Sequence, residues 1–167
     1  MQQDSINFFI SVAALVIAIL SLFRTNELKR EQPKKETAHS IALQLGAYER
    51  LVLLCERISI PNLVSRTNEP LRSAREMQLV LLDNIKQEFE YNTSQQIYVS
   101  QIAWNAVQNL RDQSLLIINQ ISNVLPPDAK ANDLNKQLLD VIMSQKEKAL
   151  HTIVLEALNV EAKKLMK

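Results

Sequence analysis

The sequence predicts an all-α protein, in which an N-terminal single transmembrane helix is followed by an antiparallel helical bundle of about four helices. Three observations lead to this prediction. Residues 6–23 (INFFISVAALVIAILSLF) contain no charged side chain. The chain has 1 glycine and 5 prolines in 167 residues, whereas sheet proteins need glycine in their many turns. Between the prolines, apolar residues recur at helical spacing over long stretches.

The apolar run at residues 6–23 is interpreted as an uncleaved membrane anchor. As a helix it would be about 27 Å long, close to the thickness of the hydrocarbon core of a bilayer. A cleaved signal peptide would need a basic segment before the run, but residues 1–5 (MQQDS) have no Lys or Arg, and Phe23 suits a cleavage site poorly. A buried core helix is the remaining alternative, although such a helix rarely lacks charge throughout.

The cations beside the run predict its orientation. No Lys or Arg precedes it, whereas Arg24, Lys29 and Arg30 follow it closely. The positive-inside bias therefore places residues 1–5 outside the cytoplasm and the C-terminal domain inside it. Residues 24–35 form a charged juxtamembrane segment, and residues 36–167 form the predicted bundle domain.

Prolines divide the bundle domain into its expected elements, because a proline inside a helix interrupts it. The helices are expected at residues 35–58, 68–91, 93–125 and 128–167, with residues 59–68 as a connection. The first helix is apolar on two sides, which is typical of a helix packed between partners. Along it, small residues recur at every fourth position, where a neighbouring backbone could approach closely: Ala38, Ala42 and Gly46.

The third and fourth helices show clear apolar stripes. The spacing of Thr93 and Gln96 fits a capping box and predicts a helix start at Thr93. The stripe that follows runs to the pair Pro126-Pro127, before which a helix is expected to end. The fourth helix could extend beyond the bundle, where another chain would cover its apolar residues.

The sequence shows no pattern typical of catalysis, cofactor binding or metal binding. Because Gly46 is the sole glycine, glycine-rich phosphate loops are excluded. The histidines, His39 and His151, do not supply the paired Glu-x-x-His motifs of di-iron bundles. Cys55 falls on an apolar face, where a thiol packs as a small hydrophobe. A net charge of +1 provides no broad basic field for nucleic acid. We therefore expect a protein that is not an enzyme and has no cofactor.

Residues 88–100 form the densest polar and aromatic patch of the chain. Two interpretations stay open: an interhelical turn with a cap on each side, or a surface that binds a partner. Trp104, just beyond the patch, is either a core residue or an interface anchor. The candidate contact residues of an interaction surface are Tyr91, Ile97, Tyr98, Trp104 and Leu115.

Three stretches resemble a known group of sequences: residues 46–66 (GAYERLVLLCERISIPNLVSR), 88–104 (EFEYNTSQQIYVSQIAW) and 115–126 (LLIINQISNVLP). They are similar to an uncharacterised family of single-pass membrane proteins of Bacteroidota type. The resemblance implies a setting at the bacterial inner membrane. The family has no established activity, so no catalytic or binding residue is implied.

The function expected from the sequence is that of a membrane-tethered, non-enzymatic helical scaffold that acts through association with a partner or with itself. The alternative is a sensory or regulatory membrane subunit that relays a change from the membrane to the bundle. The expected partners are the lipid bilayer, through residues 6–23, and either a second copy of the chain or another membrane or cytoplasmic protein. Neither nucleic acid nor a small-molecule substrate is expected.

Overall fold

The computed structural model of the chain describes residues 38–144 and 149–166. The chain divides into two compact units, Met1–Ala42 and Leu43–Lys167. Of the first unit only residues 38–42 are described, and they are helical. The predicted N-terminus, membrane anchor and juxtamembrane segment (residues 1–5, 6–23 and 24–35) lie outside the described residues.

The all-α prediction is confirmed, but the predicted fold class needs a correction. No helix within residues 38–144 and 149–166 is long and apolar enough to cross a membrane. The predicted transmembrane helix is therefore not supported, and its residues 6–23 are not among those described. Among the described helices, α4 (Gln101–Val124) has 24 residues and would be long enough to cross a bilayer. Its other faces carry asparagines, glutamines and the charged pair Arg111–Asp112, so the helix as a whole is too polar to cross a membrane.

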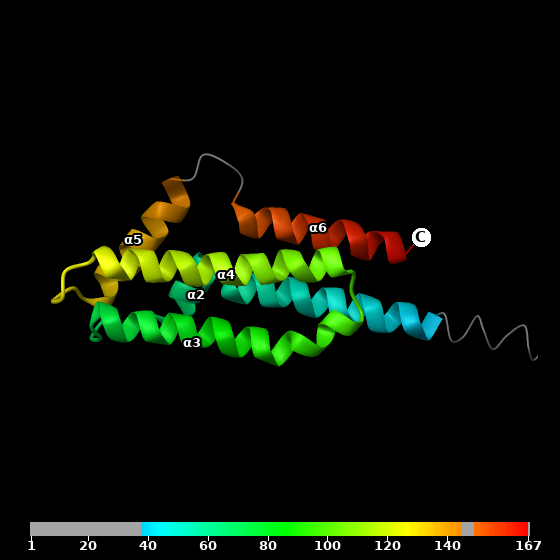
Figure 1. The fold of residues 1–167 in the computed structure, drawn as a ribbon, viewed down its shortest axis with the longest axis horizontal. Coiled ribbons are helices and arrows are strands. Elements are labelled where there is room, and N and C mark those ends of the chain that lie inside the picture. The colour runs from blue at the N-terminus through cyan, green and yellow to red at the C-terminus, as the bar shows by residue number, and fades with distance from the viewer. Residues whose placement is uncertain (1–37, 145–148, 167) are drawn as a thin grey trace, which may run out of the picture. The chain divides into compact units, whose positions relative to one another are not determined.

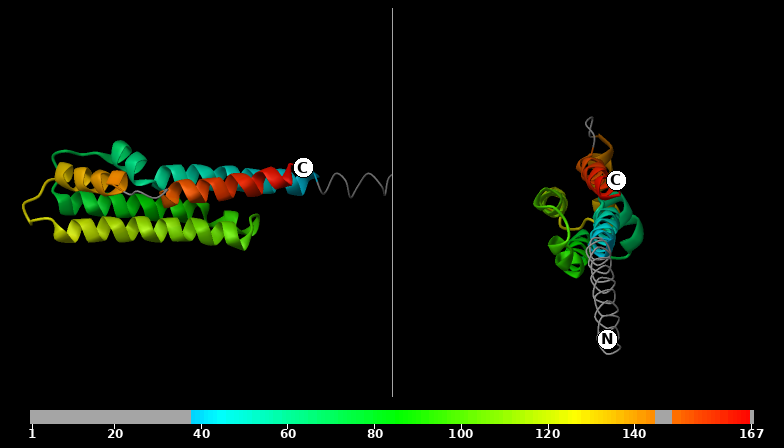
Figure 2. Two further views of the ribbon diagram at one scale, coloured as in Figure 1. Left: turned by 90° about the horizontal axis from the view of Figure 1, so that it is seen from above. Right: turned by 90° about the vertical axis from the view of Figure 1, so that its right-hand side faces the viewer.

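The second unit is a helical bundle (Figure 1). Helix α3 packs mainly against α4 and α5, and α4 also packs against α6. Figure 1 shows α3 and α4 as antiparallel neighbours, with α5 and α6 following one another along the bundle. Figure 2 shows the same succession from above. After a helical stretch at residues 38–58, the elements are α2 (Ile60–Thr67), α3 (Ala74–Asn92), the 3₁₀ helix η1 (Thr93–Ile97), α4 (Gln101–Val124), α5 (Ala131–Ser144) and α6 (Leu150–Leu165).

Serine caps define where α3 and α4 begin. The Ser73 hydroxyl accepts a hydrogen bond from the backbone N–H of Glu76, and the Glu76 carboxylate accepts one from the backbone N–H of Ser73. This reciprocal pair is a capping box. These hydrogen bonds lower the pKa of Glu76. The Ser100 hydroxyl accepts from the backbone N–H of Ala103 at 3.0 Å and caps α4.

The predicted helix start at Thr93 is wrong. The Thr93 hydroxyl donates backward to the carbonyl oxygen of Phe89 at 3.1 Å. It therefore does not cap a following helix, and residues 93–97 instead extend α3 as η1. The next regular helix starts at Gln101, after Ser100.

Two further elements differ from the prediction. The expected connection at residues 59–68 contains α2, since Pro61 is tolerated in a first helical turn. Helix α2 buries Ile60, Leu63 and Val64 against its neighbours. The expected single helix at residues 128–167 is observed as two helices, α5 and α6. Together α5 and α6 occupy the place of a fourth bundle helix (Figure 2).

The core is apolar and runs through every helix of the second unit. Its largest fully buried side chains are Leu51, Leu54, Ile58, Leu63, Met77, Leu81, Ile85, Ile118, Leu134, Leu138 and Leu158. Gln78 is the polar member of this buried group. Its amide donates to Asn119 Oδ1 at 2.7 Å and accepts from the Ser122 hydroxyl at 2.8 Å. Burial of this amide is tolerated because both of its ends are hydrogen-bonded across to α4.

The beginnings of α3 and α5 are joined by backbone pairing. The N–H of Ala74 donates to the carbonyl oxygen of Ala129 at 2.9 Å. The N–H of Ala131 donates to the carbonyl oxygen of Arg72 at 3.0 Å. Ser73 and Lys130 thereby form an antiparallel bridge. The two helices start side by side, which fixes their axial register.

Candidate functional site

Exposed apolar side chains gather along the chain where α3 gives way to α4. Tyr91 is 77% exposed, Ile97 74% and Ile102 75%, and Tyr98 is also exposed. We call these four residues the α3–α4 end surface. Three of them were candidate contact residues in the sequence. All four lie within residues 91–102 of the sequence. Exposed apolar patches are a common mark of a protein interface.

The other two candidate contact residues, Trp104 and Leu115, pack in or against the core. Trp104 is only 4% exposed and belongs to the core, where its ring centroid lies 5.2 Å from that of Phe89. The guanidinium of Arg111 lies 4.1 Å from the Phe89 ring centroid. Leu115 is half-buried against the same core. Of the two interpretations left open for Trp104, the structure supports the core residue.

A partly buried polar cluster lies next to the α3–α4 end surface and ties three helices together. The Tyr48 hydroxyl and the Ser100 hydroxyl each donate to Glu161 Oε2, both at 2.6 Å. The backbone N–H of Ser100 donates to the Tyr48 hydroxyl at 3.3 Å. Burial raises the pKa of Tyr48, and its hydrogen bond to Glu161 raises it further. Ile97 and Tyr98 share a groove of about 470 Å³ with this cluster, so the cluster holds the surface in place.

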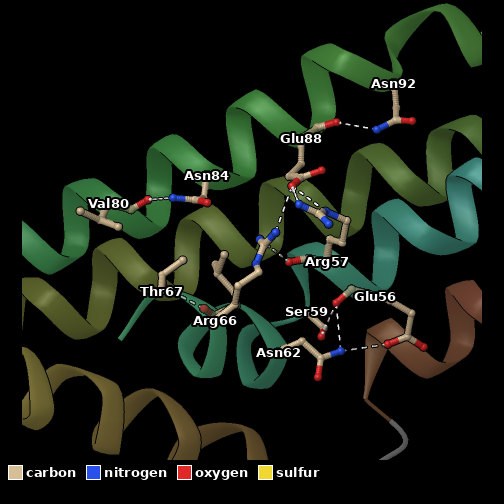
Figure 3. A network of polar contacts seen from close by, with 11 residues as sticks. Glu56, Arg57, Ser59, Asn62, Arg66, Thr67, Val80, Asn84, Glu88 and Asn92 are labelled. Carbon is tan, nitrogen blue, oxygen red and sulfur yellow. Dashed lines mark hydrogen bonds and ion pairs between the residues drawn. The ribbon is translucent and has the colours of Figure 1, made fainter. Parts of the chain in front are cut away.

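A second polar cluster joins the helix at residues 38–58 to α2 and α3 (Figure 3). Arg57 Nε donates to Glu88 Oε1 at 2.6 Å, and Arg66 Nη1 donates to the same oxygen at 3.1 Å. Arg57 and Glu88 line a groove of about 560 Å³ together with Leu53 and Tyr91. Burial raises the pKa of Glu88, but the hydrogen bonds and charges of the two arginines outweigh it, and the net pKa is lowered.

Replacing Glu88 with glutamine should make the stability of the protein less sensitive to acid. A carboxylate with a lowered folded-state pKa contributes stability above its unfolded pKa, and that contribution is lost as the pH falls through the folded pKa. For Glu88 the loss begins below the ordinary value of 4.5. Urea unfolding of wild type and Glu88→Gln as the pH falls below that value measures this effect. An equal decline in both proteins would contradict it, and Glu90→Gln, an exposed neighbour, is the control.

A cavity of about 360 Å³ lies where residues of the helix at 38–58, α2, α4, α5 and α6 meet. Its wall is mainly apolar, with Ile60, Leu110, Ile117, Ile142 and Leu150 among its residues. The polar side chains of Glu56, Ser114 and His151 also line it. The sequence did not predict this cavity, because residues 128–167 were expected to form one helix. The break between α5 and α6 instead brings His151 against Glu56, at 3.5 Å between Nε2 and Oε2.

A neighbouring backbone was predicted to approach the small residues along 38–46 closely. Among the described residues, none does so at Gly46. A Cβ atom added to Gly46 would meet no described atom within 4 Å. Ala38 and Ala42 belong to the first unit. An approach of a neighbouring backbone to these three small residues stays a prediction.

The packing of Cys55 makes it unreactive. Its side chain is fully buried in the core, as its apolar face predicted. Burial raises the pKa of the thiol to about 12, with a smaller contribution from the charge of Glu56. Because the thiolate is the reactive form, Cys55 is a poor nucleophile at neutral pH. Among the described residues, no three His, Cys, Asp or Glu side chains form a group that could hold a metal ion.

Comparison with known proteins gives one match. The model of a family described as a family of unknown function (DUF7935) matches residues 5–165. No curated protein and no solved structure matches the chain. The family match fits the predicted resemblance to an uncharacterised family. It does not show the membrane setting or the Bacteroidota origin that the resemblance implied.

Proposed function

The chain belongs to this family of unknown function, and membership brings no established activity. From the geometry we propose that the chain is a non-enzymatic helical module that acts by binding another protein chain. The α3–α4 end surface carries the proposal. Its residues Tyr91, Ile97 and Ile102 each leave most of their side chain in water. Tyrosine is enriched among the residues that dominate binding energy at interfaces.

The surroundings of the surface support this function. The Tyr48–Ser100–Glu161 cluster holds the start of α4 against α6, and the Glu88 cluster holds the end of α3 against the helix at residues 38–58. A backbone that is already held in place loses little conformational freedom on binding. Arg50, Arg57 and Glu88 line the same groove as Leu53 and Tyr91, and interfaces combine such charged and apolar side chains.

The sensory alternative and the setting at a bacterial inner membrane stay predictions. A sensory subunit would need a second packing of the bundle, in which the fully buried Cys55 becomes accessible to alkylation.

Site-specific photo-crosslinking tests the proposed interface. The photoreactive residue p-benzoylphenylalanine replaces Ile97 in the full chain, expressed in its native cells. We expect a discrete adduct, whose mass identifies either a second copy or a different protein. Replacing both Tyr91 and Ile97 with alanine should weaken association about tenfold or more, because each removes an exposed anchor.

Leu71 is the matched control, since it is 99% exposed and lies between α2 and α3, away from the proposed surface in sequence. The photoreactive residue at position 71 should give no discrete adduct. Equal crosslinking at positions 71 and 97, or no discrete adduct at position 97, would contradict the proposed interface.

A further inference from the structure

The cavity between the helices contains polar groups that the packing leaves unused. Ser114 is 5% exposed, lines the cavity, and its hydroxyl forms no hydrogen bond within residues 38–144 and 149–166. His151 Nε2 is buried and likewise has no hydrogen-bond partner among the described residues. Buried polar groups are nearly always hydrogen-bonded, so the unpartnered His151 Nε2 beside this cavity requires an explanation.

Glu56 adds a hydrogen-bond acceptor to the same cavity. Its carboxylate Oε2 accepts one hydrogen bond, from the Asn62 amide at 3.0 Å (Figure 3). The distance of 3.5 Å from His151 Nε2 to this oxygen is longer than a good hydrogen bond. An ionised carboxylate can only accept hydrogen bonds, whereas the Ser114 hydroxyl can donate or accept. The cavity therefore offers both kinds of partner to a single polar group.

We propose that this cavity binds a compact, neutral, apolar molecule that carries one hydroxyl group. The apolar wall of isoleucines and leucines accepts the hydrocarbon part, and a volume of about 360 Å³ falls in the usual range of ligand pockets. A hydroxyl donates to the Glu56 carboxylate and accepts from both the Ser114 hydroxyl and the His151 ring. The sequence carries no motif that predicts a small-molecule partner. This site shares no residue with the α3–α4 end surface.

The charge of Glu56 selects against one related class of ligand. A carboxylate of the same shape would place its negative charge beside Glu56, where like charges repel at short distance. It would also have no proton to donate to the Glu56 oxygens. A plain hydrocarbon would fill the apolar part but leave Ser114 and His151 without partners. The hydroxyl compound should therefore bind more tightly than either analogue.

Fluorescence titration of the full chain with 2-naphthol at neutral pH tests the site, with naphthalene and 2-naphthoate as the analogues. We expect saturable binding of one 2-naphthol per chain. Replacing Ile117 with tryptophan fills the cavity and should weaken binding about tenfold or more, which corresponds to about 1.4 kcal/mol. Leu116→Trp is the matched control, since Leu116 is exposed on the same helix and does not line the cavity.

Ser114→Ala keeps the shape of the packing and tests the hydrogen bond separately. It should weaken 2-naphthol binding about two- to tenfold and leave naphthalene binding unchanged. Circular dichroism checks that each variant is folded, and Ser114→Ala serves alone if Ile117→Trp does not fold. Absence of saturable 2-naphthol binding, equal affinity for 2-naphthoate, or a Ser114→Ala variant that binds 2-naphthol as wild type does would each overturn the proposal.

Discussion

Replacing Trp104 with alanine should lower the free energy of unfolding by about 3–5 kcal/mol, the usual cost of truncating a buried tryptophan. Trp104 is 4% exposed, and its ring packs against Phe89 where the end of α3 meets the start of α4. The variant would leave a large void, and Phe89 would lose the ring that it packs against. Urea unfolding followed by circular dichroism measures the change.

Ile102→Ala provides the control for Trp104→Ala, because Ile102 lies on the same helix but is 75% exposed. Its effect on stability should stay within about 0.5 kcal/mol. If Trp104→Ala were as stable as Ile102→Ala, the tryptophan would not be a core residue in solution. The interpretation of Trp104 as an interface anchor would then be favoured.

Replacing Tyr48 with phenylalanine should lower the free energy of unfolding by about 1.5–3 kcal/mol, the range for hydrogen bonds to charged groups. The variant removes the hydroxyl that donates to Glu161 and accepts from the backbone N–H of Ser100. The ring remains, so the apolar packing is unchanged. Chemical denaturation measures the change, and faster hydrogen exchange along α6 would show that its attachment is weakened.

Tyr98→Phe is the control for Tyr48→Phe, since the Tyr98 hydroxyl forms no hydrogen bond in the described part of the chain. The two variants should also differ in alkali. Tyr48 has a pKa raised above 10.0, so its contribution is complete below pH 10.0 and is lost as the pH rises through the folded-state pKa. Tyr48→Phe should remove this alkaline decline, and an unchanged decline would show that the cluster does not form.

The sequence predicted the end of a helix correctly where proline residues interrupt the chain. The proline pair after Leu125 ends α4 close to the predicted residue. The start at Thr93 was wrong because a threonine hydroxyl can bond either to a following N–H or to a preceding carbonyl, and spacing does not distinguish the two. The break between α5 and α6 has neither proline nor glycine to mark it, so the stripe of apolar residues continued through it without a visible change.

The candidate sites were predicted less completely than the helices. Tyr91, Ile97 and Tyr98 stood out because they are large apolar residues in a polar stretch. Trp104 stood out for the same reason, although it packs against Phe89 and is buried. The cavity brings together residues from three stretches far apart in the chain, 56–62, 110–117 and 142–151. Periodicity along one helix carries no information about which distant stretches pack together.

The backbone bridge between Ser73 and Lys130 has a consequence for the order of folding. It joins residues on either side of the whole α3–α4 hairpin. Closing so long a loop from an unfolded chain has an entropic cost, whereas the folded hairpin already brings its two ends together. The hairpin should therefore form first, and the amides of Ala74 and Ala131 should become protected from hydrogen exchange only after it.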